Sequence, residues 1–508
     1  MLKARELAIL CCFLTSPAAA QEPRCPEIDA PRIARGPYVQ ALDRDRAEVL
    51  WVTVDPLETR LRWRPAADPV WRDLPPTSGT RHRARIGDLL PDSEYLYEVI
   101  DQSAGGDVIL AGGPIFRFRT APPPGTSFRA IAVGDSGIAT DSQFAVKRML
   151  CDLDPPPAFF LHTGDLDYLA NLDMSVFGPY REILAGTCFY PSHGNHDPSD
   201  EVWDAAFFPP IGDPGETSTI YSFDWGSAHF TVLDTELDVI EGSPQMEFLR
   251  TDLGRARARG VRWLVLVFHV PLYTTGAYYL DLKRILTNAA IAPVTDEFAV
   301  DLVITGHDHN WQRSHPIRGG VARDAWQDPE FVAPAGTLHV VTGGGGQVTY
   351  GRDPSSDSSL NRVFIAEHHA LELEVTDDYI HGRAIAPCEL HREEPCPEKV
   401  IVLDAFTIRK DRPRPPLRFL RGDADLSGAL DIGDAVGVLM HLFSGGPPLE
   451  CPAAADSDGS GFPLDLTDPV FLLRHLFVGD ATPPPPFPEC GPAPSADDSG
   501  CLRAGCPS

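Results

Sequence analysis

The stretch that decides the fold is residues 128–137, FRAIAVGDSG. Six strand-like residues lead directly into a turn that holds Asp135 between two glycines. The same order, an apolar run followed by a polar loop, returns at residues 158–162, 263–268 and 302–305. Helical stretches lie between some of these runs, at residues 142–150 and 245–258. This alternation predicts an α/β layered domain whose site lies on the loops at the strand ends.

Five short motifs stand at the ends of the predicted strands, and each has a side chain that can bind a metal. They are Gly134-Asp135-Ser136-Gly137, Gly164-Asp165-Leu166-Asp167-Tyr168, Gly194-Asn195-His196-Asp197, Val267-Phe268-His269 and Gly306-His307-Asp308-His309. Glycine allows sharp, sometimes left-handed turns that direct a carboxylate or an imidazole at an ion near the backbone. Oxygen and imidazole ligands together suit iron, manganese or zinc better than copper. One such motif alone is usually an ordinary turn, but five in this order predict a metal site.

These motifs resemble those of the calcineurin-like metallophosphoesterase superfamily. Tyr168 after the second motif, and a β domain ahead of the catalytic one, are similar to features of purple acid phosphatases. The resemblance covers about residues 36–408 and implies an α/β metallophosphoesterase β-sandwich flanked by helices at residues 126–410. It also implies an enzyme that hydrolyses phosphate monoesters, with a small phosphate ester as its substrate.

The resemblance implies a dinuclear centre, iron with iron, zinc or manganese, whose two ions share Asp165. One ion would be held by Asp135, Asp165, Tyr168 and His309, and the other by Asp165, Asn195, His269 and His307. A shared carboxylate sets two ions about 3.5–4 Å apart, so that both touch one phosphate, which a metal-bridging hydroxide attacks. Tyr168 has an alternative interpretation as a core tyrosine beside a zinc or manganese pair.

His196 is the expected catalytic acid. It would hydrogen-bond the phosphate or protonate the departing alkoxide, and the alternative is a histidine that orients Asp165 or a backbone carbonyl. The chain departs from plant-type members after His269, where they place further histidines and this chain has PLYTTGAYY at residues 271–279. Tyr278 or Tyr279 would replace those donors, or the two would form a packed aromatic pair. His368 and His369 are interpreted as structural.

The chain ahead of residue 121 is predicted to be an all-β domain. Residues 47–54, AEVLWVTV, alternate apolar and polar side chains, and similar short runs separated by turns predict a small β-sandwich. Residues 89–99, LLPDSEYLYEV, resemble the corner before a late strand in fibronectin type III-like domains, where a tyrosine packs. We place this domain at residues 30–120, before a stiff linker, APPPG, at residues 121–125.

A small α-helical calcium-loop module is predicted at residues 420–480. The first loop has EF-hand spacing, with oxygen side chains at Asp423, Asp425, Ser427, Asp431 and Asp434. The pattern recurs at Asp456, Asp458 and Ser460, followed by Asp465 and Asp468, each one place late. The two copies resemble a dockerin type I repeat pair, which implies bound Ca²⁺ and an extracellular protein partner. The alternative is an acidic tail without calcium, and residues 481–508 form a Pro/Cys-rich tail.

The N-terminus and the composition indicate where the protein acts. Residues 1–20 combine Lys3 and Arg5 with a short apolar run and three alanines, which is typical of a cleaved secretory signal. We therefore expect a secreted, extracellular or cell-surface protein without a transmembrane segment. The formal net charge of -29 argues against nucleic-acid binding.

Nine of the eleven cysteines follow the predicted signal, an odd number where disulfides persist. Proximity in the sequence suggests four pairings, which are Cys388 with Cys396, Cys501 with Cys506, Cys151 with Cys188, and Cys451 with Cys490. Cys25 would then be the free thiol.

The leading hypothesis is a secreted dinuclear-metal phosphomonoesterase in a multidomain chain. A phosphodiesterase or nucleotide hydrolase of the same superfamily is the alternative within the enzyme class. A non-catalytic surface protein, with the same fold as a scaffold between the β domain and the docking module, is the alternative outside it.

Overall fold

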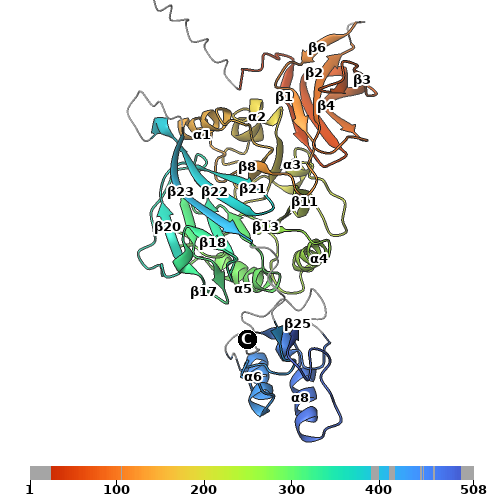
Figure 1. Cartoon of the computed structure of the whole chain (residues 1–508). Coiled ribbons are helices and arrows are strands. Elements are labelled where there is room, and N and C mark those ends of the chain that lie inside the picture. The colour runs from red at the N-terminus through yellow and green to blue at the C-terminus, as the bar shows by residue number, and fades with distance from the viewer. Residues whose placement is uncertain are drawn as a thin grey trace, which may run out of the picture.

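The computed structural model describes residues 25–103, 106–390, 400–410, 418–444, 446, 449, 451–460 and 464–492. The predicted signal, Cys396, Cys501, Cys506 and most of the predicted tail lie outside these ranges. Three parts follow one another along the chain, as Figure 1 shows: a β domain, a central α/β part, and a small helical module below it. Within the described ranges, every helix is too short or too polar to span a bilayer.

Two seven-stranded sheets build the central part. The first has the order β10 (Cys188–Pro191), β9 (Phe159–His162), β8 (Phe128–Val133), β21 (Ala370–Val375), β22 (Tyr379–Pro387), β23 (Val400–Arg409) and β18 (Glu330–Val332). The second has the order β11 (Tyr221–Trp225), β12 (Ala228–Val232), β13 (Trp263–Val267), β14 (Leu302–Thr305), β19 (Leu338–Thr342), β15 (Trp311–Ser314) and β20 (Asn361–Ile365). A two-stranded pair, β16 (Ile317–Arg318) and β17 (Val321–Ala322), stands beside them.

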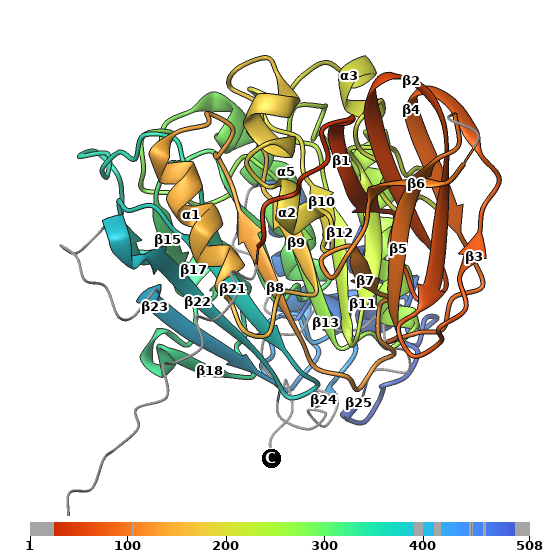
Figure 2. The same ribbon diagram turned by 90° about the horizontal axis from the view of Figure 1, so that it is seen from above.

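The sheets pack face to face, and helices cover their outer faces (Figures 1 and 2). Phe159 of the first sheet packs between Trp225 and Phe230 of the second, with ring centroids 5.0 and 5.3 Å away. On the outer faces, α1 (Asp141–Cys151) packs against the first sheet and α4 (Pro244–Ala258) against the second. These are the two helices that the sequence predicted. The other helices of this part are η1 (Asp173–Phe177), α2 (Arg181–Leu184), α3 (Asp200–Asp204), α5 (Leu282–Glu297), η2 (Ala325–Gln327) and η3 (Cys388–Leu390).

Parallel pairing determines where the loops gather. In the first sheet β8, β9 and β10 run parallel, and in the second sheet β12, β13, β14 and β19 do. Because neighbouring parallel strands end at the same edge of a sheet, the loops after β8, β9, β10, β13 and β14 lie together. The five motifs occupy those loops, so the topology brings them to one place.

The N-terminal part is all-β. Its seven strands form one hydrogen-bonded sheet: β1 (Ile33–Gln40), β2 (Ala47–Pro65), β3 (Arg72–Asp73), β4 (Thr77–Ile86), β5 (Glu94–Asp101), β6 (Val108–Ala111) and β7 (Arg117–Arg119). The first half of the long strand β2 pairs with β1, its second half pairs with β3 and β5, and β4 pairs with parts of both halves. The buried Tyr95 hydroxyl accepts a 2.8 Å hydrogen bond from the Leu90 N–H, as a tyrosine corner does. The two-sheet sandwich itself stays a prediction.

The C-terminal module is small and helical. It contains α6 (Ile432–Phe443), α7 (Pro452–Ala455) and α8 (Thr467–Phe477), with the short strands β24 (Arg418–Phe419) and β25 (Gly491–Pro492) at its base. Asp431 and Asp434 form a capping box at the start of α6, so two of the predicted calcium-loop carboxylates also fix where this helix begins.

The cysteine pairing differs from the prediction. Cys25 is bonded to Cys151, with their Cα atoms 5.5 Å apart, and Cys188 is free and buried. The predicted pair Cys151–Cys188 and the free Cys25 were therefore wrong. Cys188 belongs to the core between the two sheets, whereas Cys25 and Cys151 pack on the outer face of the first sheet, so this sheet separates them. Cys388, Cys451 and Cys490 are disulfide-bonded.

Candidate metal centre

Four of the five motifs supply two clusters of buried ligand atoms that share one residue. Asp165, His269 and His307 form the first cluster, and Asp135, Asp165 and His309 form the second. The ligand atoms within each cluster lie within 4.8 Å of one another. Asp165 belongs to both, and the carboxylates of Asp135 and Asp165 are almost completely buried. A carboxylate with two oxygens is therefore placed between two groups of donors.

The other two predicted ligands lie beside these clusters. The Tyr168 hydroxyl donates to Asp165 Oδ2 at 2.8 Å and lies 3.1 Å from His309 Nε2, next to the second cluster. Asn195 Oδ1 lies 3.1 Å from His269 Nε2, next to the first. All seven side chains therefore lie together, five of them in two clusters and the other two beside the clusters in which the family resemblance places them.

His269 and His309 turn their Nε2 atoms towards this centre. His269 Nδ1 lies 2.8 Å from the Thr163 carbonyl oxygen, and His309 Nδ1 lies 2.9 Å from the Val348 carbonyl oxygen. Each carbonyl accepts from a protonated Nδ1, so Nε2 is the nitrogen that faces the carboxylates and can bind a metal once it has no proton. Backbone carbonyls orient metal-ligating histidines in this way. The donor set fits a pair of transition-metal ions.

Burial and neighbouring charges shift the pKa values of the two aspartates in opposite directions. Burial raises the pKa of Asp135. Burial alone would also raise the pKa of Asp165, but the neighbouring His269 and hydrogen bonds hold it well below its usual value. The pKa of His307 is lowered to about 2, first by burial and then by the charge of His269. A neutral His307 and an ionised Asp165 can bind metal directly. The pKa of His269 is raised to about 10, because the charge of Asp165 outweighs the effect of burial, so His269 must lose a proton when metal binds.

The backbone reaches this geometry in a way that differs from the prediction. Of the motif glycines, only Gly164 adopts a left-handed conformation, with φ 94°, while Asp135, Asp165 and His307 themselves have φ values of 56°, 57° and 70°. Such conformations cost about 1–3 kcal/mol each and are typical of functional sites. The other glycines permit close approach instead: a Cβ on Gly194 would lie 2.4 Å from the Asp165 nitrogen.

Asp197 holds two of the motif loops together. Its Oδ1 accepts hydrogen bonds from the Leu166 and Asp167 N–H groups, and its Oδ2 accepts from those of Asp165 and Gly194. Burial and the charge of Asp165 raise its pKa to about 7. The sequence places Asp197 in the third motif, but its role follows only from these contacts with the preceding loop.

Aromatic rings surround the histidines of the centre. The Tyr278 ring packs on His307, with centroids 3.9 Å apart, and the Tyr350 ring packs on His309 at 4.6 Å. The Tyr350 hydroxyl also donates to the His307 carbonyl oxygen at 2.8 Å. Tyr279 instead lies under the Arg284 guanidinium, so the predicted Tyr278–Tyr279 pair was wrong. Tyr350 was not predicted because no motif surrounds it.

His196 stands at the exposed side of the centre. Its N–H donates to Asp165 Oδ1 at 2.9 Å, and its ring packs 4.4 Å from the Tyr168 ring. The contact with Asp165 therefore comes from the backbone, and the exposed imidazole is free to meet a bound substrate.

The acidic residues of the C-terminal module form two further clusters. Asp423, Asp425 and Asp434 form one, and Asp456, Asp458 and Asp468 form the other. The remaining predicted calcium residues hydrogen-bond to these aspartates through their backbone N–H groups: Ser427 and Asp431 to the first cluster, and Ser460 and Asp465 to the second.

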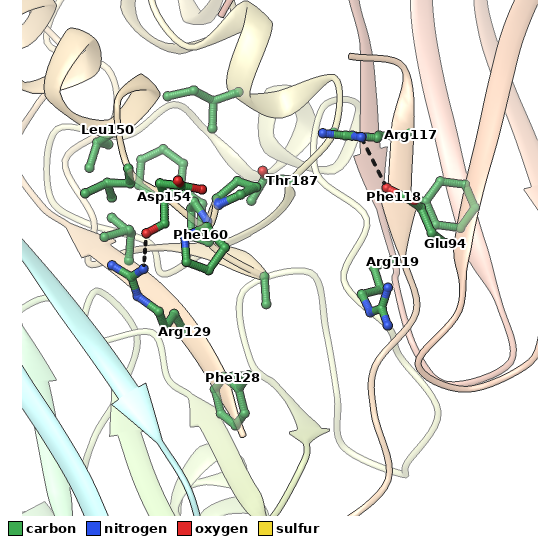
Figure 3. A pocket seen from close by; sticks show the side chains of 18 of the residues that line it. Glu94, Arg117, Phe118, Arg119, Phe128, Arg129, Leu150, Asp154, Phe160 and Thr187 are labelled. Carbon is green, nitrogen blue, oxygen red and sulfur yellow. Dashed lines mark hydrogen bonds and ion pairs between the residues drawn. The ribbon is translucent and has the colours of Figure 1, made fainter. Parts of the chain in front are cut away.

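A cavity of about 790 Å³ lies between the N-terminal domain and the first sheet, away from these clusters. Figure 3 shows two of its arginines with partners: Arg117 lies 3.4 Å from Glu94, and Arg129 donates to the Asp154 carbonyl oxygen at 2.9 Å. None of the seven candidate ligands lines it. Its size alone does not make it the functional site.

Residues 128–311 match the family model described as calcineurin-like phosphoesterase. This segment is similar to calcineurin-like phosphoesterase domains. The matched residues include all five motifs. Among curated proteins, a probable inactive purple acid phosphatase 1 from Arabidopsis thaliana is 29% identical over 388 residues, which cover 68% of this chain and 60% of that protein.

Two further relatives are named for different activities. Purple acid phosphatase 15 of Arabidopsis thaliana is 25% identical over 53% of this chain and 54% of its own length. A nucleotide pyrophosphatase/phosphodiesterase of Hordeum vulgare is 28% identical over 48% of this chain and 76% of its own length. The first three relatives are matched over only 51–60% of their length. The domain match and these relatives show that the chain is similar to phosphoester hydrolases of the purple acid phosphatase type.

Solved structures agree on the fold. A purple acid phosphatase from yellow lupin (Lupinus luteus) seeds superposes with a TM-score of 0.61 at 20% identity, covering 76% of this chain and 74% of that one. PhoD superposes with a TM-score of 0.54 at 12% identity, covering 76% and 92%. At these identities the superpositions establish a shared fold only.

Proposed function

We propose that this protein hydrolyses phosphate monoesters at a dinuclear metal centre. The observation that carries the proposal is the position of Asp165, whose carboxylate belongs to both ligand clusters. Asp135, Tyr168 and His309 would hold one ion with it, and the first cluster with Asn195 would hold the other. When bound, two such ions neutralise phosphate charge and lower the pKa of bound water towards neutrality.

The residues of the chain supply orientation and a proton. The exposed His196 imidazole lies beside Tyr168, at the side of the centre where a substrate can enter. There it would donate a hydrogen bond to the phosphate or protonate the departing alkoxide, as general acid catalysis requires. The Tyr278 ring packs on His307, so it would limit how a leaving group on that side of the centre is oriented.

The second enzymatic candidate is a phosphodiesterase or nucleotide hydrolase. It is supported by the Hordeum vulgare relative, which is named as a nucleotide pyrophosphatase/phosphodiesterase. A non-catalytic scaffold is supported by another relative, which is named probable inactive purple acid phosphatase 1. Against the scaffold, every expected ligand stands in this centre.

The test combines metal analysis, a visible spectrum and two substrates, on full chain purified without chelator. We expect two metal ions per chain including iron, a broad visible band that Tyr168→Phe removes, and faster hydrolysis of 4-nitrophenyl phosphate than of bis(4-nitrophenyl) phosphate. Tyr279→Phe is the matched control, because Tyr279 contacts Arg284 rather than a candidate ligand. It should keep the band.

Each departure from this result selects another hypothesis. Two zinc or manganese ions without a band would keep the hydrolase and remove the tyrosinate-iron centre. Faster diester hydrolysis would favour the phosphodiesterase. If the protein bound no transition metal even on reconstitution, the non-catalytic scaffold would be the remaining hypothesis.

We also propose a secreted protein whose N-terminal domain is fibronectin type III-like and whose C-terminal module binds Ca²⁺ and docks to an extracellular protein. The two triads of aspartates support the calcium sites. Docking is supported by apolar side chains on the solvent side of α6, which are 46–68% exposed: Ile432, Val436, Met440 and Phe443. Their spacing places them along one face of the helix.

Calcium titration of the full chain tests the module. We expect two Ca²⁺ ions by calorimetry and one after Asp434→Asn, because a clustered carboxylate is lost. Asp480→Asn should keep both, since Asp480 pairs with Arg474 outside the clusters. Met440→Asp should abolish retention on extracellular fractions without changing calcium stoichiometry. Two ions bound to Asp434→Asn would contradict the first site, and unchanged retention would contradict docking through α6.

A further inference from the structure

Four large apolar side chains are exposed to solvent where the chain enters helix α5. They are Leu280, Leu282, Ile285 and Leu286, which are 66%, 67%, 41% and 52% exposed. The last three are spaced as neighbours on one face of the helix, while Thr287 and Ile291 on the opposite side are buried. We call these four side chains the α5 patch. Neighbouring apolar side chains left in water mark a binding surface, unlike apolar residues scattered singly.

The topology places the α5 patch beside the metal centre. Helix α5 connects the parallel strands β13 and β14, so its first turn lies at the sheet edge where the ligand loops gather. Tyr278, whose ring packs 3.9 Å from that of His307, precedes Leu280 by two residues. The Asp281 N–H donates to the Tyr278 carbonyl oxygen at 3.0 Å, which closes a turn that carries Leu280. The patch therefore begins next to a side chain that contacts a candidate ligand.

Buried contacts hold this loop against the loop that follows β14. The Thr274 hydroxyl and the Tyr278 N–H both donate to the carboxylate of Asp308, which is fully buried. Gly276 approaches the same carboxylate so closely that a Cβ would not fit between them. These contacts fix Tyr278, and with it the start of the patch, relative to His307.

The charges near the patch disfavour a second anionic group on the substrate. Residues 269–282, HVPLYTTGAYYLDL, contain no lysine or arginine. The next two residues are cations with partners of their own: Lys283 pairs with Glu236, and Arg284 donates to the Leu272 carbonyl oxygen at 3.0 Å. This side of the centre therefore suits an uncharged, apolar leaving group better than one that carries further phosphates.

We propose that the substrate is the phosphate monoester of a long-chain alcohol, an amphiphile whose alkyl chain lies on the α5 patch. This substrate class rests on the proposed function, because the metal centre would hold the phosphate. Hydrolysis breaks the phosphate ester bond with one water and gives the alcohol and inorganic phosphate. The chain contacts are the same before and during that step, so they lower KM and leave kcat unchanged.

Kinetics with butyl phosphate and octyl phosphate test the proposal on the full chain, with both esters below the critical micelle concentration. Complete burial of one CH₂ strengthens binding about fourfold. Four further CH₂ groups, each partly buried on an open surface, should therefore lower KM for the octyl ester at least about tenfold. We expect kcat for the two esters to agree within about twofold.

Two double variants locate the chain on the protein. Leu282→Gln combined with Leu286→Gln should remove the difference between the two KM values, because glutamine keeps the helix and replaces apolar surface with an amide. Leu90→Gln combined with Ile109→Gln is the matched control and should keep the difference, since these side chains are 67% and 54% exposed in the N-terminal domain. Leu280→Gln, which lies ahead of the helix, should reduce the difference as well.

Equal KM values for two hydrolysed esters would overturn the proposal and leave the proposed phosphatase standing. An unchanged difference in the patch variants would also overturn it, because the chain would lie elsewhere. A wild-type dimer in sedimentation that the patch variants convert to a monomer would assign the patch to a second copy of this chain and overturn it too.

If the wild type hydrolysed neither these esters nor 4-nitrophenyl phosphate, the proposed function would fail. Calorimetry with octylphosphonate and butylphosphonate, which have no ester bond to hydrolyse, would then decide the patch alone. Tighter binding of octylphosphonate that the patch variants abolish would support an amphiphile site, and equal affinities would overturn it.

Discussion

Asp165→Asn is expected to lower kcat/KM for 4-nitrophenyl phosphate by on the order of 1,000-fold or more. The asparagine keeps the shape of the side chain and can still meet the Tyr168 hydroxyl and the His196 N–H. It removes the one negative charge common to both ligand clusters. We therefore expect the metal content, measured by plasma mass spectrometry, to fall from two ions per chain to one or none.

Asp167→Asn is the control, because it shows whether the loss of any buried carboxylate in this loop lowers metal content and activity. Asp167 is 4% exposed and lies in the same loop, but its Oδ1 accepts from Ser175 and the Asn171 N–H rather than contacting a candidate ligand. This variant should be less stable and should keep both ions and most of its activity. An Asp165→Asn protein with two bound ions and wild-type turnover would show that Asp165 is not shared.

The strands and the motifs that follow them could be predicted because both depend on local sequence. An apolar run that leads into Gly134-Asp135 predicts a buried strand and a tight loop, and the structure has β8 and the centre there. Parallel pairing then brings loops together that lie far apart in the chain. The expected partition of the ligands came from the family resemblance, not from this local pattern.

The contacts that could not be predicted join residues distant in sequence. The run Gly343 to Gly346 packs under the centre, and a Cβ on Gly343 would lie 2.7 Å from Asp135 Oδ2. Nothing near these glycines in the sequence indicates that approach. The Cys25–Cys151 disulfide spans 126 residues, so the rule of sequence proximity could not find it. Tyr350 likewise reaches His307 across 43 positions.

Asp197→Asn is expected to destabilise the protein although Asp197 is not a candidate ligand. Its carboxylate accepts four backbone hydrogen bonds, at 2.6 and 3.1 Å on Oδ1 and at 3.0 and 2.8 Å on Oδ2. An amide keeps one oxygen and turns its NH₂ group against two backbone donors. Two orphaned buried N–H groups cost about 2–6 kcal/mol together, at about 1–3 kcal/mol each.

The same substitution should weaken metal binding, because Asp197 ties the loop that carries Asp165 to the loop that carries Asn195. Loss of such a supporting contact typically lowers metal affinity about 10–100-fold. Chelator competition measures that affinity, and thermal unfolding of the metal-free protein measures stability. Asp200→Asn is the control, since Asp200 is exposed at the start of α3 and should change neither quantity. If Asp197→Asn matched Asp200→Asn in both measurements, the two loops would be held by their own backbone, and the four hydrogen bonds would not determine the position of Asp165.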